Sequence, residues 1–294
     1  MAEAAERGSI AGPMRPAMLP LIVPAAILFL LAFLLPLGML VQQSFATFIP
    51  GRVTTSSAFT LENYAKLLDP AYIGFFLDTF RLSLFSTAVS LVLAYLGAYF
   101  IARQRRGWLR TAAVAVLIGM LFVSGMVRVY GLSLSLGTAG LLGFLGDRFG
   151  FAINDIRLLE TNVVIGIVHY TAPLMALTLV GTLQNVDPRF ENAAEILGAS
   201  RVRAFFDTTV ALSLPGIVSA FFLGYAMAVS AFTIPLFLGN GIVVSVTMLI
   251  YKRFSEVPNY PFGSAIAVAL LVASLGLVAL GAAAMRLTRR IRAA

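Results

Sequence analysis

Long apolar runs, separated by short polar segments, dominate the pattern of this 294-residue sequence. A helix needs about 20 residues to cross the roughly 30 Å of bilayer hydrocarbon. Six runs are near or above that length: residues 19–41, 76–102, 111–136, 162–183, 210–238 and 263–285. A seventh run, 242–251, is too short to span and is expected to form an external re-entrant or surface helix. The pattern predicts an all-α polytopic membrane protein with six transmembrane helices.

The first run differs from a secretory signal, because its apolar core is longer than that of a typical signal peptide. We therefore expect it to be retained as the first span. Residues 1–18 are predicted to form a tail, and residues 19–294 a single transmembrane domain.

Composition agrees with this class. The chain is 60% hydrophobic and 12% charged, with a mean hydropathy of +0.93, whereas soluble domains carry about 25% charged residues. The lack of cysteine excludes disulfides and thiolate metal sites, and a single histidine, His169, argues against histidine metal clusters. No catalytic or metal site is predicted. We assign the net charge of +8 to interaction with the lipid bilayer and expect no nucleic-acid partner.

Basic residues predict the orientation of the spans. Thirteen lysines and arginines lie on the side of the chain termini, and six lie in the opposite loops. Because basic residues collect in cytoplasmic loops, both termini and residues 187–208 are expected to be cytoplasmic.

Residues 187–208 form an unusually polar segment between two apolar runs. Asp187 and Pro188 predict a helix start, and Gly198 allows the chain to turn. Ser200 is expected to cap a second short helix over 201–208. The two helices would make a compact knob that protrudes from the membrane.

The first of these helices has two faces. Phe190, Ala193, Ala194 and Leu197 recur at helical spacing and form an apolar face, while Glu191 and Glu195 lie elsewhere on the helix. The small residues allow close approach of a partner, and the charges can set its orientation. A connector that lies on the lipid surface is the competing interpretation.

The residues Ala193-Ala194 and Gly198 resemble the cytoplasmic coupling loop of permease subunits from binding-protein-dependent ABC importers. Asn192 stands where the family has glutamate, and Ala211 stands where it commonly has proline. Pro215 matches the later proline of the polyamine-type branch.

The resemblance extends over most of the chain. Residues 61–64 and 78–83 are similar to the family's entry into its second span. Residues 127–130 and 232–239 look most like spermidine/putrescine-type permeases, a branch whose members also carry other organic solutes. Pathway residues come from several spans, so the solute itself is not identified beyond a polyamine or another small organic molecule.

The resemblance implies a non-catalytic permease subunit of the bacterial inner (plasma) membrane that forms half of a solute pathway. Its implied partners are a second permease subunit, two ATPase subunits and an external or periplasmic solute-binding protein. The chain would bind no cofactor, since ATP-Mg would sit on the ATPase subunits, and it contains no Gly-x-x-x-x-Gly-Lys-Ser/Thr loop. Expected contacts to the ATPase are Glu191, Asn192, Ala193, Ala194, Glu195, Gly198, Ala199 and Ser200.

Polar residues within the apolar runs are candidates for the solute pathway, because they are costly in hydrocarbon and should face protein or water. They are Arg128, Tyr130, His169, Ser230, Thr233 and Pro235. Arg128 is equally well interpreted as a structural anchor that pairs with a carbonyl or an acidic loop residue. Helix packing is the alternative for the others.

Two other functions fit the composition. An intramembrane serine hydrolase would need Gly-x-Ser-Gly, and Ser124-Gly125 lacks the first glycine. A six-span secondary transporter or channel that works without ATP is the stronger rival, but it gives no reason for the 187–208 segment.

Overall fold

The computed structural model describes residues 19–50, 59–137, 140–150 and 155–293, and these are almost entirely helical. The predicted tail, residues 1–18, lies outside the described residues. Six segments are long and apolar enough to span a membrane: Val23–Ser44, Pro70–Arg103, Gly125–Phe149, Ile156–Gln184, Arg201–Ser230 and Tyr260–Ala283. The all-α, six-span prediction is confirmed.

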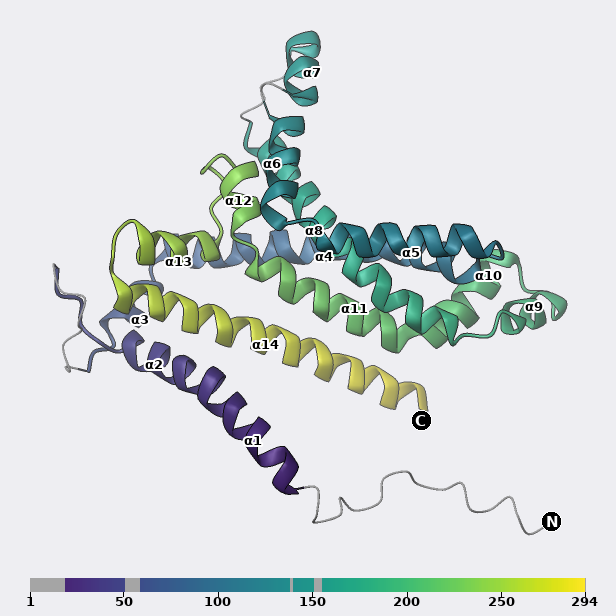
Figure 1. Cartoon of the computed structure of the whole chain (residues 1–294), viewed down its shortest axis with the longest axis horizontal. Coiled ribbons are helices and arrows are strands. Elements are labelled where there is room, and N and C mark those ends of the chain that lie inside the picture. The colour runs from purple at the N-terminus through teal and green to yellow at the C-terminus, as the bar shows by residue number, and fades with distance from the viewer. Residues whose placement is uncertain (1–18, 51–58, 138–139, 151–154, 294) are drawn as a thin grey trace.

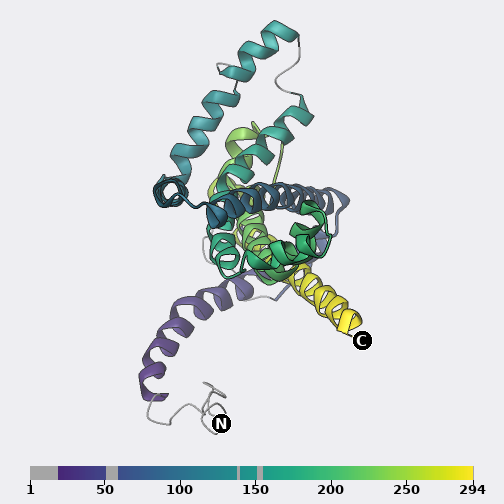
Figure 2. The same cartoon turned by 90° about the vertical axis from the view of Figure 1, so that its right-hand side faces the viewer.

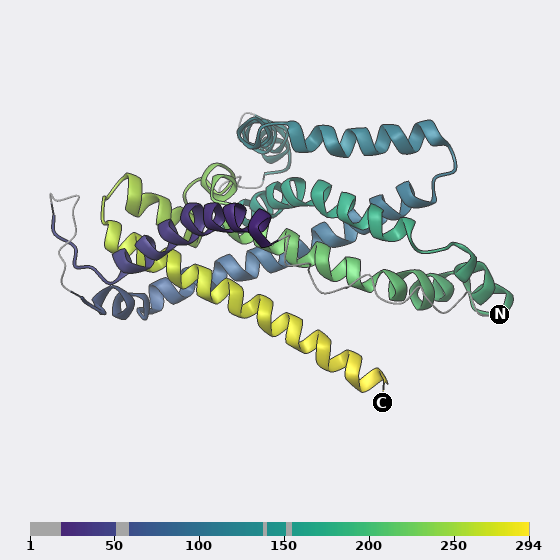
Figure 3. The same cartoon turned by 60° about the horizontal axis from the view of Figure 1, so that its bottom comes forward.

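Three long helices form the centre of the molecule: α4 (Pro70–Arg103), α8 (Ile156–Gln184) and α11 (Ala211–Ser230) pack side by side (Figures 1 and 3). Small residues allow this close approach, because Ala94 and Ala98 of α4 are buried against Met175 and Leu179 of α8. A row of buried hydroxyls on α4 adds polar contacts, and Ser90 hydrogen-bonds Thr171 of α8 at 2.8 Å.

The first span is one continuous helical rod, built from α1 (Leu19–Phe29), a π-helical turn (Leu30–Leu34) and α2 (Leu35–Ser44). It splays away from the centre and contacts α14 (Tyr260–Ala293) through α2 (Figure 2). The described residues bury none of its most apolar stretch, which is therefore a surface for lipid or another subunit.

The prediction that residues 111–136 form the third span as a single helix is wrong. The backbone becomes extended at Val123 and Ser124, with ψ of 126° and 135°, and separates α5 (Gly107–Phe122) from α6 (Gly125–Leu136). α5 lies along the central helices, whereas α6 and α7 (Leu141–Phe149) turn away from them (Figure 1). Hydropathy alone cannot reveal this turn, because both sides of it are apolar.

The fifth predicted span, 210–238, is likewise interrupted. α11 ends at Ser230, Ala231 is extended with ψ of 114°, and α12 (Thr233–Leu238) follows as a separate short helix. At its start, α11 continues without a break from α10 (Arg201–Ala204) through a π-helical segment (Phe205–Val210). The prediction of a separate second helix in the knob is therefore wrong. Residues 201–208 form the first part of the fifth span instead.

Short helices cap the two ends of the bundle. α3 (Glu62–Leu67) and α13 (Val246–Ser255) lie at one end, and α9 (Arg189–Ile196) lies at the other (Figure 1). The short apolar run at 242–251 thus forms a helix, α13, as expected. Asn63 ties α3 to the end of the first span by donating to the carbonyls of Ser44 and Ala46.

Candidate functional site: a docking knob and a cavity between broken helices

The knob at the α9 end forms by the local rules that the sequence predicts. Asp187 accepts a hydrogen bond from the Arg189 amide at 2.9 Å, which satisfies one free donor at the helix start. At the other end Gly198 adopts a left-handed φ of +91°. The Ala199 amide then reaches back to the Ala194 carbonyl and the Gly198 amide to the Glu195 carbonyl, both at 3.0 Å, which is the Schellman motif.

The apolar face of α9 has no partner within the described part of the chain. Leu197 is 88% exposed, Ile196 85% and Phe190 54%, and Ala193 is also exposed. Exposure of several apolar side chains at the tip of a short projecting helix is unfavourable in water. Such a face is typical of a surface that binds a partner protein or lipid.

Glu191 points the opposite way and fastens α9 to the bundle. Its carboxylate accepts from the Tyr99 hydroxyl at 3.1 Å and from the Thr209 hydroxyl, and it pairs with the Arg103 guanidinium at 3.5 Å. Arg103 also donates to the Val186 carbonyl at 2.9 Å, and both charged side chains are only 18% exposed. Sequence reasoning missed Tyr99, Arg103 and Thr209, because their distance along the chain gives no local signal.

The other predicted contact residues lie around the exposed tip. Asn192, Glu195, Gly198 and Ser200 are exposed, while Ala194 and Ala199 are half-buried. Ser200 caps α10 as predicted, its hydroxyl oxygen accepting from the Arg203 amide at 3.4 Å. Glu191 is thus the member of the predicted set whose carboxylate is bonded into the chain itself.

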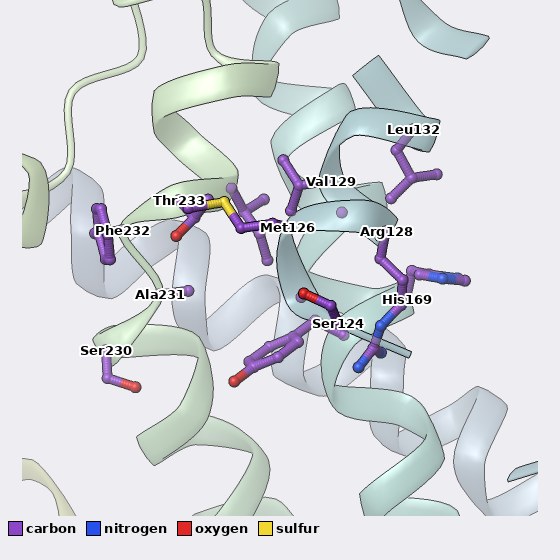
Figure 4. Close-up of a pocket in the computed structure, with 14 residues that line it drawn as sticks. Ser124, Met126, Arg128, Val129, Leu132, His169, Ser230, Ala231, Phe232 and Thr233 are labelled. Carbon is purple, nitrogen blue, oxygen red and sulfur yellow. The ribbon is translucent and has the colours of Figure 1, made fainter. Parts of the chain in front are cut away.

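A cavity of about 400 Å³ lies where the two interrupted helices meet. Residues at the α5–α6 break and at the α11–α12 break line it together with α8 (Figure 4). Its lining is Ser124, Gly125, Met126, Arg128, Val129, Leu132, Gly166, His169, Tyr170, Ser230, Ala231, Phe232, Thr233 and Ile234. Broken helices at membrane depth expose backbone groups, which proteins tolerate only where the break is buried or borders an aqueous cavity.

Arg128 is the only arginine or lysine among the described residues that line the cavity. Its Nη2 donates to the Val123 carbonyl at 3.2 Å, and its guanidinium lies over the Tyr170 ring at 5.6 Å. Its Nε and Nη1 atoms are buried and have no hydrogen-bond partner in the described structure. The contact to a carbonyl is what a structural anchor makes, but it leaves two buried donors of this cavity-lining residue without a partner in the described structure.

Four of the six predicted pathway residues converge on this cavity from four helices. Arg128 comes from α6, His169 from α8, and Ser230 and Thr233 flank the α11–α12 break on the other side (Figure 4). Tyr130 and Pro235 do not line it. Tyr130 is exposed and packs on Phe237 with ring centroids 4.9 Å apart, and Pro235 is buried within α12.

The cavity also contains residues that the sequence did not single out for the pathway, above all Tyr170 and Phe232. Tyr170 stands directly after His169, so the polar stretch 169–171 within an apolar run was a usable signal. No such signal in the sequence marked Phe232, because Phe232 reaches the cavity only where the helix is interrupted at Ala231.

Comparison with known proteins identifies the family. Residues 71–292 match the model of the binding-protein-dependent transport system inner membrane component. The spermidine/putrescine transport system permease protein PotB of Salmonella typhimurium (strain SL1344) is 31% identical over 216 residues, which cover 73% of this chain and 75% of that protein. PotB of Escherichia coli (strain K12) is 30% identical, with coverage of 73% and 78%.

PhnU of Salmonella typhimurium (strain LT2), named as a candidate permease of a 2-aminoethylphosphonate transport system, is 25% identical over 90% of this chain and 89% of its own length. Among solved structures, a bacterial ABC transporter involved in alginate import superposes with a TM-score of 0.67 at 16% identity. That comparison covers 94% of this chain and 96% of the other and shows a shared fold. The chain belongs to the family of inner-membrane permease components of binding-protein-dependent ABC importers, which are non-catalytic subunits.

Proposed function

We propose that the α9 knob is the docking element for an ATPase subunit, and that the cavity between the broken helices is part of the solute pathway. The observation that carries this proposal is the division of α9 into two faces. Its apolar tip is exposed, whereas Glu191 holds the other face rigidly against α4 and the start of the fifth span.

The fifth span joins the two places. Thr209, in the π-helical segment that leads into α11, bonds Glu191, and Ser230 at the end of α11 lines the cavity. At 1.5 Å per residue this helix reaches roughly 30 Å. A displacement of α9 would therefore be transmitted along one continuous helix to the wall of the cavity.

In this proposal the chain forms half of the pathway with a second permease subunit, related or identical. Two ATPase subunits that bind ATP-Mg dock on the α9 knobs from the cytoplasm, and an external solute-binding protein delivers the solute at the α3 and α13 end. The excess of basic residues on the side of the chain termini supports this orientation, in which both termini are cytoplasmic. ATP binding would close the ATPase pair and open the pathway outward, and hydrolysis would reset it.

The likeness to PotB supports a small organic solute, a polyamine or another molecule that carries an amino group. The likeness to PhnU widens the range of candidate solutes to aminophosphonates, because 2-aminoethylphosphonate, the solute in its name, also has an amino group. The binding protein is expected to dominate selection of the solute, and the cavity adds a second contact.

Gly198→Trp tests the docking assignment. A Cβ atom at Gly198 would meet no described atom of the chain within 4 Å, and the left-handed backbone there adds a strain of about 1–2 kcal/mol. We expect solute-stimulated ATP hydrolysis in the reconstituted complex to be abolished, while the subunit remains in the membrane.

Gly150→Trp is the matched control. Gly150 also has a positive φ, +74°, and open space around it, but it ends α7, far from the knob. Equal loss of coupling in both variants would indicate general damage, and normal coupling with Gly198→Trp would overturn the docking assignment.

A further inference from the structure

We infer that Arg128 binds an anionic group of the transported solute, a carboxylate or a phosphonate. The inference rests on the proposed pathway and extends it to the chemistry of the solute. It starts from an unbalanced charge: the described lining of the cavity contains an arginine and no aspartate or glutamate.

The imbalance extends beyond the cavity. No acidic residue occurs between Asp78 and Asp147, between Glu160 and Asp187, or between Asp207 and Glu256. These intervals contain most of α4, α5, α6, α8, α11 and α12, so the helices around the cavity offer no carboxylate at its depth. A polycation passing this subunit would meet the positive charge of Arg128 and no compensating group from the same chain.

The charge of Arg128 is only partly compensated by the described chain. A buried guanidinium without an anionic partner is costly, and the neutral Val123 carbonyl and the Tyr170 ring compensate only part of that cost. The Nε and Nη1 atoms remain buried and unpartnered. Arginine donors match carboxylate and phosphonate oxygens in geometry and charge, and such bonds are about twice as strong as neutral ones.

The surroundings complete a site for a small amphiphilic anion. A volume of about 400 Å³ lies within the range of small-molecule pockets. The hydroxyls of Ser124 and Thr233 lie on its wall, and Met126, Leu132 and Phe232 supply apolar surface. An amino group at the far end of the solute, as the polyamine-type relatives suggest, would lie away from Arg128.

The direct test uses the purified full chain in lipid nanodiscs with three probes of similar length: putrescine, 4-aminobutyrate and 2-aminoethylphosphonate. The first two differ by exchange of one protonated aminomethyl group for a carboxylate. We expect at least one of the two anion-bearing probes to bind and putrescine not to bind. In Arg128→Gln the affinity should fall at least tenfold, and Arg128→Lys should recover part of it.

Arg81→Gln is the matched control, because Arg81 sits outside the cavity lining and is paired with Glu160 at 2.6 Å. It should leave probe binding unchanged. Binding of putrescine by the wild-type chain, no binding of either anion-bearing probe, or equal anion binding by wild type and Arg128→Gln would each overturn the inference. The ATPase measurement with Gly198→Trp does not involve this site, so failure here would leave the docking assignment intact.

Discussion

Glu191 and Arg128 are charged residues of one chain in opposite circumstances. Glu191 has a cation and two hydroxyl donors from other parts of the chain, and together they hold α9 in place. Arg128 has one carbonyl and one ring, and two of its buried nitrogen atoms have no partner. Glu191 is paired with an opposite charge inside the chain, whereas Arg128 lines a cavity and has no carboxylate partner among the described residues. We therefore propose a mechanical role for the α9 end and a role in solute recognition for the cavity.

The largest expected effect comes from removing the internal anchor. Glu191→Ala leaves Arg103 without its anion and frees α9 from α4, a loss of about 2–3 kcal/mol in interactions with a charged group. We expect solute-stimulated ATP hydrolysis of the reconstituted complex to fall at least tenfold.

Glu195→Ala is the comparison variant, one helical turn away, exposed and in no ion pair with the described part of the chain. It leaves α9 anchored, and because an exposed charge pair contributes at most about 1 kcal/mol, ATP hydrolysis should fall by less than about fivefold. Equal effects of the two substitutions would remove the distinction between an anchored face and an exposed face of α9.

A smaller effect, on the stability of the subunit rather than on ATP hydrolysis, is expected from substitution of Arg128. Because the guanidinium is not paired with a carboxylate in this chain, Arg128→Gln should leave the melting temperature of the purified subunit unchanged or raise it. Glu191→Gln should lower it under the same conditions. A lower melting temperature for Arg128→Gln than for Glu191→Gln would make Arg128 the structural anchor and reverse the comparison.

The smallest expected effect is that of the Ser200 cap. Its hydroxyl accepts from the Arg203 amide at the long distance of 3.4 Å, so Ser200→Ala should cost at most about 1 kcal/mol. We expect a small decrease in melting temperature and a decrease in coupling of less than about fivefold. An effect as large as that of Glu191→Ala would mean that Ser200 contacts the partner directly.

The sequence predicted the parts of this molecule that depend on local signals. Asp187, Gly198 and Ser200 predicted the start, the turn and the cap of the knob, and hydropathy predicted the number of spans. Arg128, His169, Ser230 and Thr233 were chosen singly as polar residues in apolar runs, and the fold brings them to one cavity.

Features that depend on long-range packing could not be predicted. The breaks at Val123–Ser124 and at Ala231 lie inside continuous apolar runs, where hydropathy does not change when the backbone turns. One of the two hydroxyls that Glu191 accepts from belongs to Tyr99, 92 residues earlier in the chain. This partner gives Glu191 a role within the chain that its sequence position did not indicate.

Photocrosslinking from Leu197 tests the central claim, that the exposed tip of α9 docks on an ATPase subunit. A photoreactive amino acid at Leu197, which is 88% exposed, would be compared with one at Ser255, exposed at the end of α13 on the opposite side of the bundle. In membranes of cells that carry the whole importer, position 197 should form an adduct with the ATPase subunit, and position 255 should not. Adducts from position 197 to lipid alone, or to the external binding protein, would contradict the account.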